Sequence, residues 1–196
     1  MKKIWFFLGL CITFYLILPG PRLPPPDLPQ SLRSTEPGDT VQLPRISAYF
    51  TDKTRDEVLS FYTDYFARSP FLNFPLITYR LNHPPEYAKQ VVRETTRSYY
   101  LEEVVHPLRE SLFINGFEWE KDVFTQPKKR IKNKILVEGK VWRSKVTLRW
   151  FVSHWGTRLM IFWSAWLMLF IVFQQWYREI KLLIEGIKKT SLKENG

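Results

Sequence analysis

The chain has few of the residues that cross-link or metallate small domains. It has one cysteine, Cys11, which excludes an intramolecular disulfide and a zinc site built on cysteines. Its three histidines, His83, His106 and His154, are far apart in the sequence and lack the short spacing of a zinc-ligand pair. There is no glycine-rich phosphate loop, and no asparagine is followed two positions later by Ser or Thr. We therefore expect neither a metal ion nor a cofactor.

Catalytic motifs are also missing, including the serine-nucleophile elbow. Paired acids occur at Glu102 and Glu103, and at Glu118 and Glu120. On a strand, Glu102 and Glu103 point to opposite faces, so they cannot share a site, whereas Glu118 and Glu120 share a face. Two neighbouring carboxylates can do acid–base chemistry, but solvated acids are the simpler interpretation. The sequence predicts no catalytic residue.

What the chain has is one long apolar run, from Leu159 to Tyr177, LMIFWSAWLMLFIVFQQWY. The run carries no charged residue and is bracketed by Arg158 and Arg178. As a helix it is about 28 Å long, close to the roughly 30 Å thickness of a bilayer core. It is apolar on all sides, unlike the surface helix of a soluble protein. The sequence therefore predicts a transmembrane helix over residues 158–178.

Aromatic and basic residues stand at both ends of this run, as is typical of the membrane–water interface. Inside the run, we expect Trp163 and Trp166 to face lipid. The predicted interface anchors are Trp155, Arg158, Trp176, Tyr177 and Arg178.

The N-terminus has a second apolar segment. Lys2 and Lys3 precede IWFFLGLCITFYLIL, which is typical of a removable signal peptide or an uncleaved signal anchor. Cleavage prefers small residues, and the run ends in Ile17-Leu18-Pro19-Gly20-Pro21, a poor site. We therefore predict a signal anchor over residues 1–20. Residues 21–44 are rich in proline, which favours an extended spacer between the membrane and the next domain.

Residues 45–155 are predicted to form the folded domain. Thr54-Arg55-Asp56-Glu57 matches a capping box, and the apolar residues after it repeat at helical spacing to about Arg68. Pro84 and Pro85 open a second predicted helix that continues to Thr95. The predicted strands before, between and after these helices are 46–51, 75–82 and 98–105.

The rest of the domain is harder to assign. Residues 107–120 contain Asn115-Gly116, which suits a hairpin turn or a helix end, and the spacing of Leu108 and Leu112 favours a short helix. A strand over 117–124 follows it. Apolar and polar residues then alternate in 134–142 and 145–153, which predicts a hairpin turning at Arg143-Ser144.

This order of elements predicts an α+β fold: a small mixed sheet with helices packed on one face, flanked by two transmembrane helices. A ferredoxin-like arrangement is one form that the order allows. Both membrane segments have short basic flanks, which stay cytoplasmic, while a connecting domain of about 140 residues is too long to influence orientation. We expect both termini inside, the domain outside the cytoplasm, and residues 179–196 as a basic amphipathic cytoplasmic tail. Four basic residues just before the second segment count against this orientation: Arg143, Lys145, Arg149 and Arg158.

The net charge of +10 is unevenly distributed. From Lys128 to Arg149 there are nine Lys or Arg residues and one acid, Glu138. Basic residues near a charged membrane each contribute about 1 kcal/mol to binding. The candidate binding site for anionic lipid headgroups is therefore the loop with Lys128, Lys129, Arg130, Lys132 and Lys134.

A solvated loop and another polyanion remain alternatives for this charge, with nucleic acid disfavoured by the expected location. The function we expect is a non-enzymatic interaction or assembly module of the cell envelope, whose partners are the lipid bilayer and envelope proteins. The alternatives are a membrane-tethered enzyme with a carboxylate site and a binder of anionic lipid surfaces.

Overall fold

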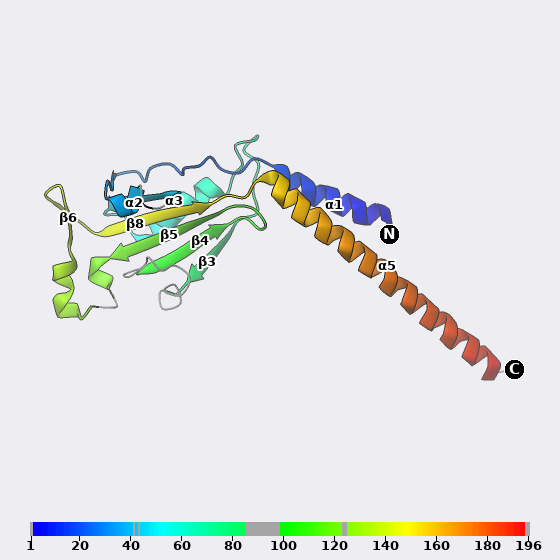
Figure 1. The fold of residues 1–196 in the computed structure, drawn as a ribbon. Coiled ribbons are helices and arrows are strands. Elements are labelled where there is room, and N and C mark those ends of the chain that lie inside the picture. Colours follow the sequence, from blue (N-terminus) through cyan, green and yellow to red (C-terminus); the bar gives the residue numbers. More distant parts are fainter. Residues whose placement is uncertain (1, 41, 43, 85–98, 123–124, 195–196) are drawn as a thin grey trace. The chain divides into compact units, whose positions relative to one another are not determined.

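The computed structural model of the chain describes residues 2–40, 42, 44–84, 99–122 and 125–194 (Figure 1). The chain divides into two compact units. One unit is helical and consists of Met1–Ile17 together with His154–Gly196. The other unit, Leu18–Ser153, is the α+β domain. The two units are described separately below.

The helical unit contains α1, Lys2–Ile17, and α5, Trp155–Glu194. Among the described residues, one helical stretch, Trp155–Glu185, is long and apolar enough to cross a membrane. This stretch contains the apolar run singled out in the sequence. Helix α1 has 16 residues and does not reach that length. The structure therefore supports one candidate span, and the prediction of two spans is not confirmed.

Helices α1 and α5 pack against each other through aromatic side chains. The ring of Trp5 stacks on that of Trp166 with centroids 4.4 Å apart, and it also lies 5.9 Å from Phe173. A Cβ on Gly9 would lie 2.8 Å from Nε1 of Trp166, so glycine permits the close approach of the helices. Trp166 thus packs between helices, and the prediction that it faces lipid is wrong.

The second unit is built on a six-stranded sheet in the order β1-β2-β8-β5-β4-β3. All neighbouring strands are antiparallel, so the predicted mixed sheet is wrong. The chain runs from β2 through a helix to β3, and three strands lie between these two strands in the sheet. In a ferredoxin-like split unit, a single strand lies between the two strands that a helix connects. The fold is therefore not ferredoxin-like. The strands are β1 Ser31–Arg33, β2 Ile46–Thr51, β3 Tyr79–His83, β4 Tyr100–Val105, β5 Ser111–Glu118 and β8 Ser144–Phe151.

Helix α3, Arg55–Phe66, covers one face of this sheet and forms the core with it. The predicted capping box at its start is confirmed: the hydroxyl of Thr54 accepts from the backbone N–H of Glu57, and the Glu57 carboxylate accepts from that of Thr54. The side chains of α3 in the core are Val58, Leu59, Tyr62 and Phe66, and those of the sheet are Tyr49, Tyr100, Val104, Leu112, Ile114, Val146 and Leu148.

The short helix predicted after Pro107 is wrong, because Ser111–Glu118 forms the central strand β5. Its residues alternate between buried and half-buried, the pattern of a strand with one face packed on the core. Gly116 lies mid-strand beneath the ring of Tyr100, its partner across β4, where a Cβ would come within 2.1 Å of the ring. Gly116 therefore serves close packing rather than a turn or a helix end.

The predicted hairpin turn at Arg143-Ser144 is also wrong. The turn falls at Glu138-Gly139, where both residues have positive φ, 52° and 75°. It joins two short strands, β6 Ile135–Val137 and β7 Lys140–Trp142, which form a sheet of their own. Positive φ at both central residues is the geometry of a tight hairpin turn that glycine favours. β8 instead pairs with β2 and β5 in the main sheet.

The proline-rich segment is part of the domain and does not form a free spacer. It supplies the edge strand β1, the short helix α2, Pro37–Thr40, and Leu28, which is 2% exposed in the core. The hydroxyl of Tyr49 donates to the carboxylate of Asp27 over 2.7 Å, and that of Tyr65 donates to a carbonyl of the same segment, at Arg22. Its many prolines do not prevent the segment from packing against the domain.

The remaining predictions concern segment ends. The helix expected from Pro84 to Thr95 lies almost entirely outside the described residues. The strand expected over 117–124 ends with β5 and continues as a 3₁₀ turn, η1, Trp119–Lys121. The predicted basic loop is a second 3₁₀ segment, η2, Pro127–Asn133. The strand at 46–51 is confirmed, and that at 75–82 is shorter and lies at Tyr79–His83.

Candidate functional site

Strands β5 and β8 run the length of the domain and define its two ends. These strands pair from Ser111 with Phe151 at one end to Glu118 with Ser144 at the other. Eight paired residues span about 25 Å. The chain enters the domain at Leu18 and leaves it at Ser153. We call these two terminal residues of the domain the chain exits. Both exits lie at the Ser111 end, and the segment after Glu118 lies at the opposite end.

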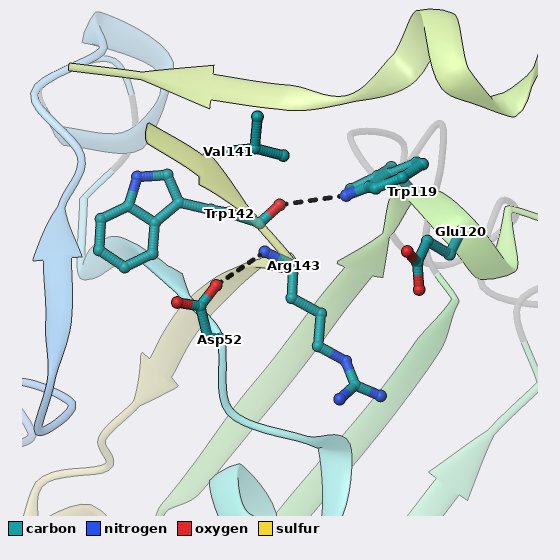
Figure 2. A pocket seen from close by; sticks show the side chains of 6 residues that line it. All are labelled: Asp52, Trp119, Glu120, Val141, Trp142 and Arg143. Atoms are coloured by element: carbon teal, nitrogen blue, oxygen red, sulfur yellow. Dashed lines mark hydrogen bonds between the residues drawn. The ribbon is translucent and has the colours of Figure 1, made fainter. Parts of the chain in front are cut away.

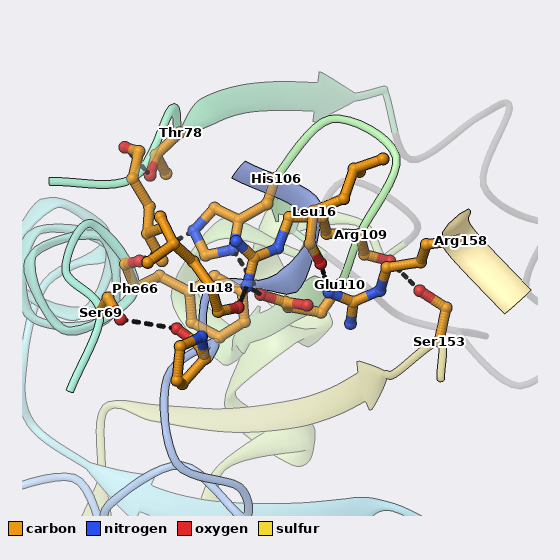
Figure 3. A network of polar contacts seen from close by, with 12 residues as sticks. Leu16, Leu18, Phe66, Ser69, Thr78, His106, Arg109, Glu110, Ser153 and Arg158 are labelled. Atoms are coloured by element: carbon orange, nitrogen blue, oxygen red, sulfur yellow. Dashed lines mark hydrogen bonds and ion pairs between the residues drawn. The ribbon is translucent and has the colours of Figure 1, made fainter. Parts of the chain in front are cut away.

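The turn between β4 and β5 joins the two chain exits (Figure 3). The guanidinium group of Arg109 donates to the backbone carbonyl of Leu18 over 2.7 Å. The hydroxyl of Ser153 donates to the backbone carbonyl of Arg109 over 3.0 Å. One residue of the turn thus contacts both the first and the last residue of the domain.

His106 and Glu110 form the buried centre of this turn. Nε2 of His106 lies 2.8 Å from the carbonyl of Phe66, which can only accept, so Nε2 carries a proton. Nδ1 lies 2.9 Å from Oε1 of Glu110, and Arg109 lies 3.0 Å from the same oxygen. The side chain of His106 is fully buried.

The opposite end carries η1, η2 and the β6–β7 hairpin; we call residues 119–122 and 125–143 the distal tip. Its basic residues differ in surroundings. Arg130 is fixed within the tip, because its side chain donates to the carbonyls of Thr125 and Glu120 over 3.2 and 2.8 Å. Nζ of Lys134 lies 5.5 Å from the ring centre of Trp119, a cation–π contact.

The other basic residues of the loop are exposed. Among the described residues, no acid forms an ion pair with Lys128, Lys129 or Lys132. Three of the five basic residues predicted as a site are therefore free to meet an external anion. The other two, Arg130 and Lys134, also shape the tip.

A shallow pocket of about 360 Å³ opens beside this loop (Figure 2). Nε1 of Trp119 donates to the carbonyl of Trp142 over 3.1 Å, and the backbone N–H of Arg143 donates to Asp52 over 3.1 Å. The Lys140 ammonium lies 2.7 Å from Asp52, and this hydrogen bond lowers the pKa of that carboxyl. The pocket is lined by Asp52, Trp119, Glu120, Val141, Trp142 and Arg143.

Two buried carboxylates lie on the helix-covered face of the sheet. Glu118 is 2% exposed, 3.2 Å from the Lys121 ammonium and 3.6 Å from Nε of Arg143. Glu102 is 1% exposed and pairs with Arg55. Burial, followed by the charge of Glu118, raises the pKa of Tyr100, which lies on the same face. The expectation that Glu118 is solvated is wrong, and each carboxylate has cations of its own.

The neighbouring acid Glu103 points to the other face, as the sequence predicted. Its carboxylate lies 3.0 Å from Nε2 of His83, whose ring stacks on Phe113. His83 is the last residue of β3. In the helical unit, His154 accepts at Nδ1 from the backbone N–H of Gly156, over 3.1 Å, at the start of α5.

The predicted interface anchors all lie on α5. Trp155 and Trp176 are 57% and 66% exposed, and Tyr177 is exposed as well. Arg158 is half-buried and donates to the carbonyl of Leu16 over 3.4 Å, whereas Arg178 lies 3.7 Å from Glu179. The exposed rings suit a membrane interface, and the anchoring role itself stays a prediction.

The chain matches no protein-family model, no curated protein and no solved structure. The site therefore stands on its geometry. The sequence did not predict the pocket or the turn at His106, because the fold brings together residues that are far apart in the chain. Asp52 and Trp142 meet in the pocket, and His106 meets Phe66 in the turn. Two of the four tryptophans outside the apolar runs, Trp119 and Trp142, line the pocket and were an available signal, because an indole combines a large apolar surface with a hydrogen-bond donor.

Proposed function

We propose that this chain is a two-span membrane protein that presents a small extracytoplasmic α+β domain as a non-enzymatic interaction or assembly module of the cell envelope. In this proposal α1 is an uncleaved signal anchor and α5 is the second span. Both termini are cytoplasmic, and the partners are the bilayer and envelope components that meet the domain.

The packing of α1 on α5 supports two spans. Helices in a bilayer associate through close packing at small residues. Gly9 lies against Trp166, and Trp5 stacks on the same ring. A removable signal peptide has no need of such a fitted partner. The shortness of α1 is accommodated by local thinning of the bilayer, at a modest cost.

The observation that carries the interaction role is that the attachment points of the domain and its exposed cations lie at opposite ends. The exits at Leu18 and Ser153 are joined through Arg109, so the domain is held at one end. The exposed cations and the pocket gather about 25 Å away, at the distal tip. A tethered module with its contact surface remote from the tether is suited to meeting a partner.

The two buried carboxylates of the sheet are engaged in ion pairs, and Asp52, which lines the pocket, is paired with Lys140. Glu102 pairs with Arg55, and Glu118 lies between Lys121 and Arg143. Neither carboxylate lines the pocket at the tip. These pairs support a structural role for both acids, which is why the interaction module is preferred over a carboxylate enzyme.

A complementation experiment separates the two functions. A strain that lacks the gene is complemented with the wild-type chain, with Glu102→Gln, or with a triple variant of the tip, Lys128→Gln, Lys129→Gln and Lys132→Gln. Fitness is measured in competition, with equal membrane levels of each chain as the control. The interaction module predicts loss with the tip variant and retention with Glu102→Gln. The opposite pattern would establish a carboxylate enzyme instead.

A further inference from the structure

We propose that the distal tip binds the surface of a second, anionic bilayer, opposite to the membrane that holds α5. The ligand class is the anionic phospholipid headgroup together with the outermost acyl carbons. This inference rests on the proposed function, because it requires the domain to be tethered at its chain exits.

Charge is the first argument. The stretch from Lys128 to Arg149 has nine basic residues and one acid. Lys128, Lys129 and Lys132 are exposed on η2 with no internal partner among the described residues. A 3₁₀ segment brings residues three apart onto one side, so Lys129 and Lys132 point the same way. Such a cluster suits an extended surface of negative charge.

Exposed apolar side chains are the second argument. Leu136 on β6 lies directly opposite Val141 on β7, so both point to the same side of the hairpin. They are 65% and 44% exposed, and Ile131 on the adjacent η2 is 61% exposed. Apolar side chains between lysines are typical of segments that lie in a membrane interface. A soluble polyanion offers such side chains no apolar environment.

The rigidity of the tip is the third argument. Arg130 ties η2 to the carbonyls of Thr125 and Glu120. The side-chain amide of Asn133 donates to Asp122 over 2.9 Å. The lysines and the apolar side chains are therefore presented by a preformed frame, so that binding orders few additional groups.

Geometry then determines which bilayer is met. Both chain exits lie at the Ser111 end of the sheet, where Arg109 joins Leu18 to Ser153. The tip follows the other end of β5, beyond Glu118. Within the domain, the tip therefore lies at the end farthest from the two chain exits. The surface that the tip reaches is then a second bilayer.

The test is vesicle capture in trans. The full chain is reconstituted in nanodiscs of neutral phosphatidylcholine and mixed with vesicles of the same lipid, or with vesicles containing about one-third phosphatidylglycerol. Flotation of the vesicles reports the nanodiscs that they carry. We expect capture by the anionic vesicles alone, and weaker capture as salt is raised, since salt screens exposed charges.

Two tip variants and one control locate the surface. Replacing Lys128, Lys129 and Lys132 with Gln should weaken capture about a hundredfold, from the usual contribution of a basic residue at an anionic bilayer. Ile131→Ser with Leu136→Ser should weaken it at least tenfold while leaving the charge unchanged. The control replaces three exposed basic residues elsewhere in the domain, Arg22, Arg45 and Arg68, with Gln, and should leave capture within about twofold.

The outcomes are distinct. No capture by anionic vesicles, or capture that ignores the tip substitutions, overturns the inference. Capture that needs the lysines, ignores Ile131 and Leu136, and is competed by soluble polyphosphate identifies an acidic polymer instead and also overturns it. The proposed function fails separately, if the chain does not enter nanodiscs at all. Circular dichroism of each variant verifies that the fold is retained.

Discussion

The guanidinium group of Arg109 donates to the carbonyl of Leu18 over 2.7 Å, and these residues are 91 positions apart in the sequence. The contact attaches the first residue of the domain to the turn between β4 and β5. Because Ser153 contacts the backbone of the same residue, the domain is closed at the end where it joins the helices. The stability of this turn depends on the buried groups beside it.

His106 is the most consequential of these groups. His106→Ala leaves the buried carboxylate of Glu110 and the carbonyl of Phe66 without this partner. We expect a loss of about 3 kcal/mol in the free energy of unfolding, as when one member of a buried pair is removed. Chemical denaturation in detergent, followed by tryptophan fluorescence, measures it.

His83 is the matched control for this substitution. It also pairs with a carboxylate, Glu103, but its side chain is 38% exposed. His83→Ala should therefore cost less than about 1 kcal/mol. Equal losses for the two variants would contradict the role assigned to the buried turn.

Gly116 tests the packing of the central strand. In Gly116→Ala the new methyl group would lie 2.1 Å from the ring of Tyr100, which is 3% exposed and has little room to move. We expect a loss of about 2 kcal/mol, within the usual range for overpacking. Gly38→Ala is the control, because its Cβ would meet one flexible side-chain atom at 3.7 Å. A thermal midpoint unchanged in Gly116→Ala would show that the strand is placed incorrectly.

Glu57 gives the domain a defined dependence on pH. Its hydrogen bond from the backbone N–H of Thr54, followed by that from the hydroxyl of Thr54, lowers the pKa of the Glu57 carboxyl below 4.5. A lowered folded-state pKa contributes stability that is present above pH 4.5 and is lost as the pH falls through the folded value. Glu57→Gln should therefore lower the thermal midpoint at pH 7 and have no effect in strong acid.

A second substitution checks that this pH dependence comes from the capping box. In a Thr54→Ala background both hydrogen bonds of the Thr54 hydroxyl are lost. Glu57→Gln should then have a smaller effect at pH 7 than in the wild-type chain. The same effect in both backgrounds would mean that the hydroxyl of Thr54 contributes little and that Glu57 acts through the backbone N–H of Thr54.

The two helices of the other unit can be tested at Gly9. Gly9→Val places a branched side chain against Trp166, where even a Cβ would be 2.8 Å from the indole nitrogen. We expect it to lower the thermal midpoint in detergent by several degrees, since close approach of the helices is blocked. Leu8→Val is the control, because Leu8 is 48% exposed. Identical midpoints for both variants would argue against this helix pair.

Local signals in the sequence predicted the elements that local chemistry decides. The apolar run after Arg158 and the capping box at Thr54 both depend on nearby residues, and both lie where they were expected. Strand partners depend on distant residues. The four-residue spacing of Leu108 and Leu112 predicted a helix, but pairing with β4 and β8 makes the segment the strand β5.

The candidate site was predictable in part. The sequence showed the lysines of η2 as a charge cluster. It did not show that the side chain of Arg130 donates to two backbone carbonyls within the tip. Leu136 and Val141 become neighbours only because the hairpin turns at Gly139 rather than at Arg143. The turn position thus decides whether an apolar pair reaches the surface.

The most direct test of the account is the topology of the chain in intact cells. Cys11 is replaced with Ser, and single cysteines are placed at Ser60, which is exposed on α3, and at Ser191 in the tail. A membrane-impermeant maleimide is then applied before and after permeabilisation. The account predicts labelling at Ser60 in intact cells and at Ser191 only after permeabilisation. Labelling at Ser191 but not at Ser60 in intact cells would place the domain in the cytoplasm and contradict the proposed function.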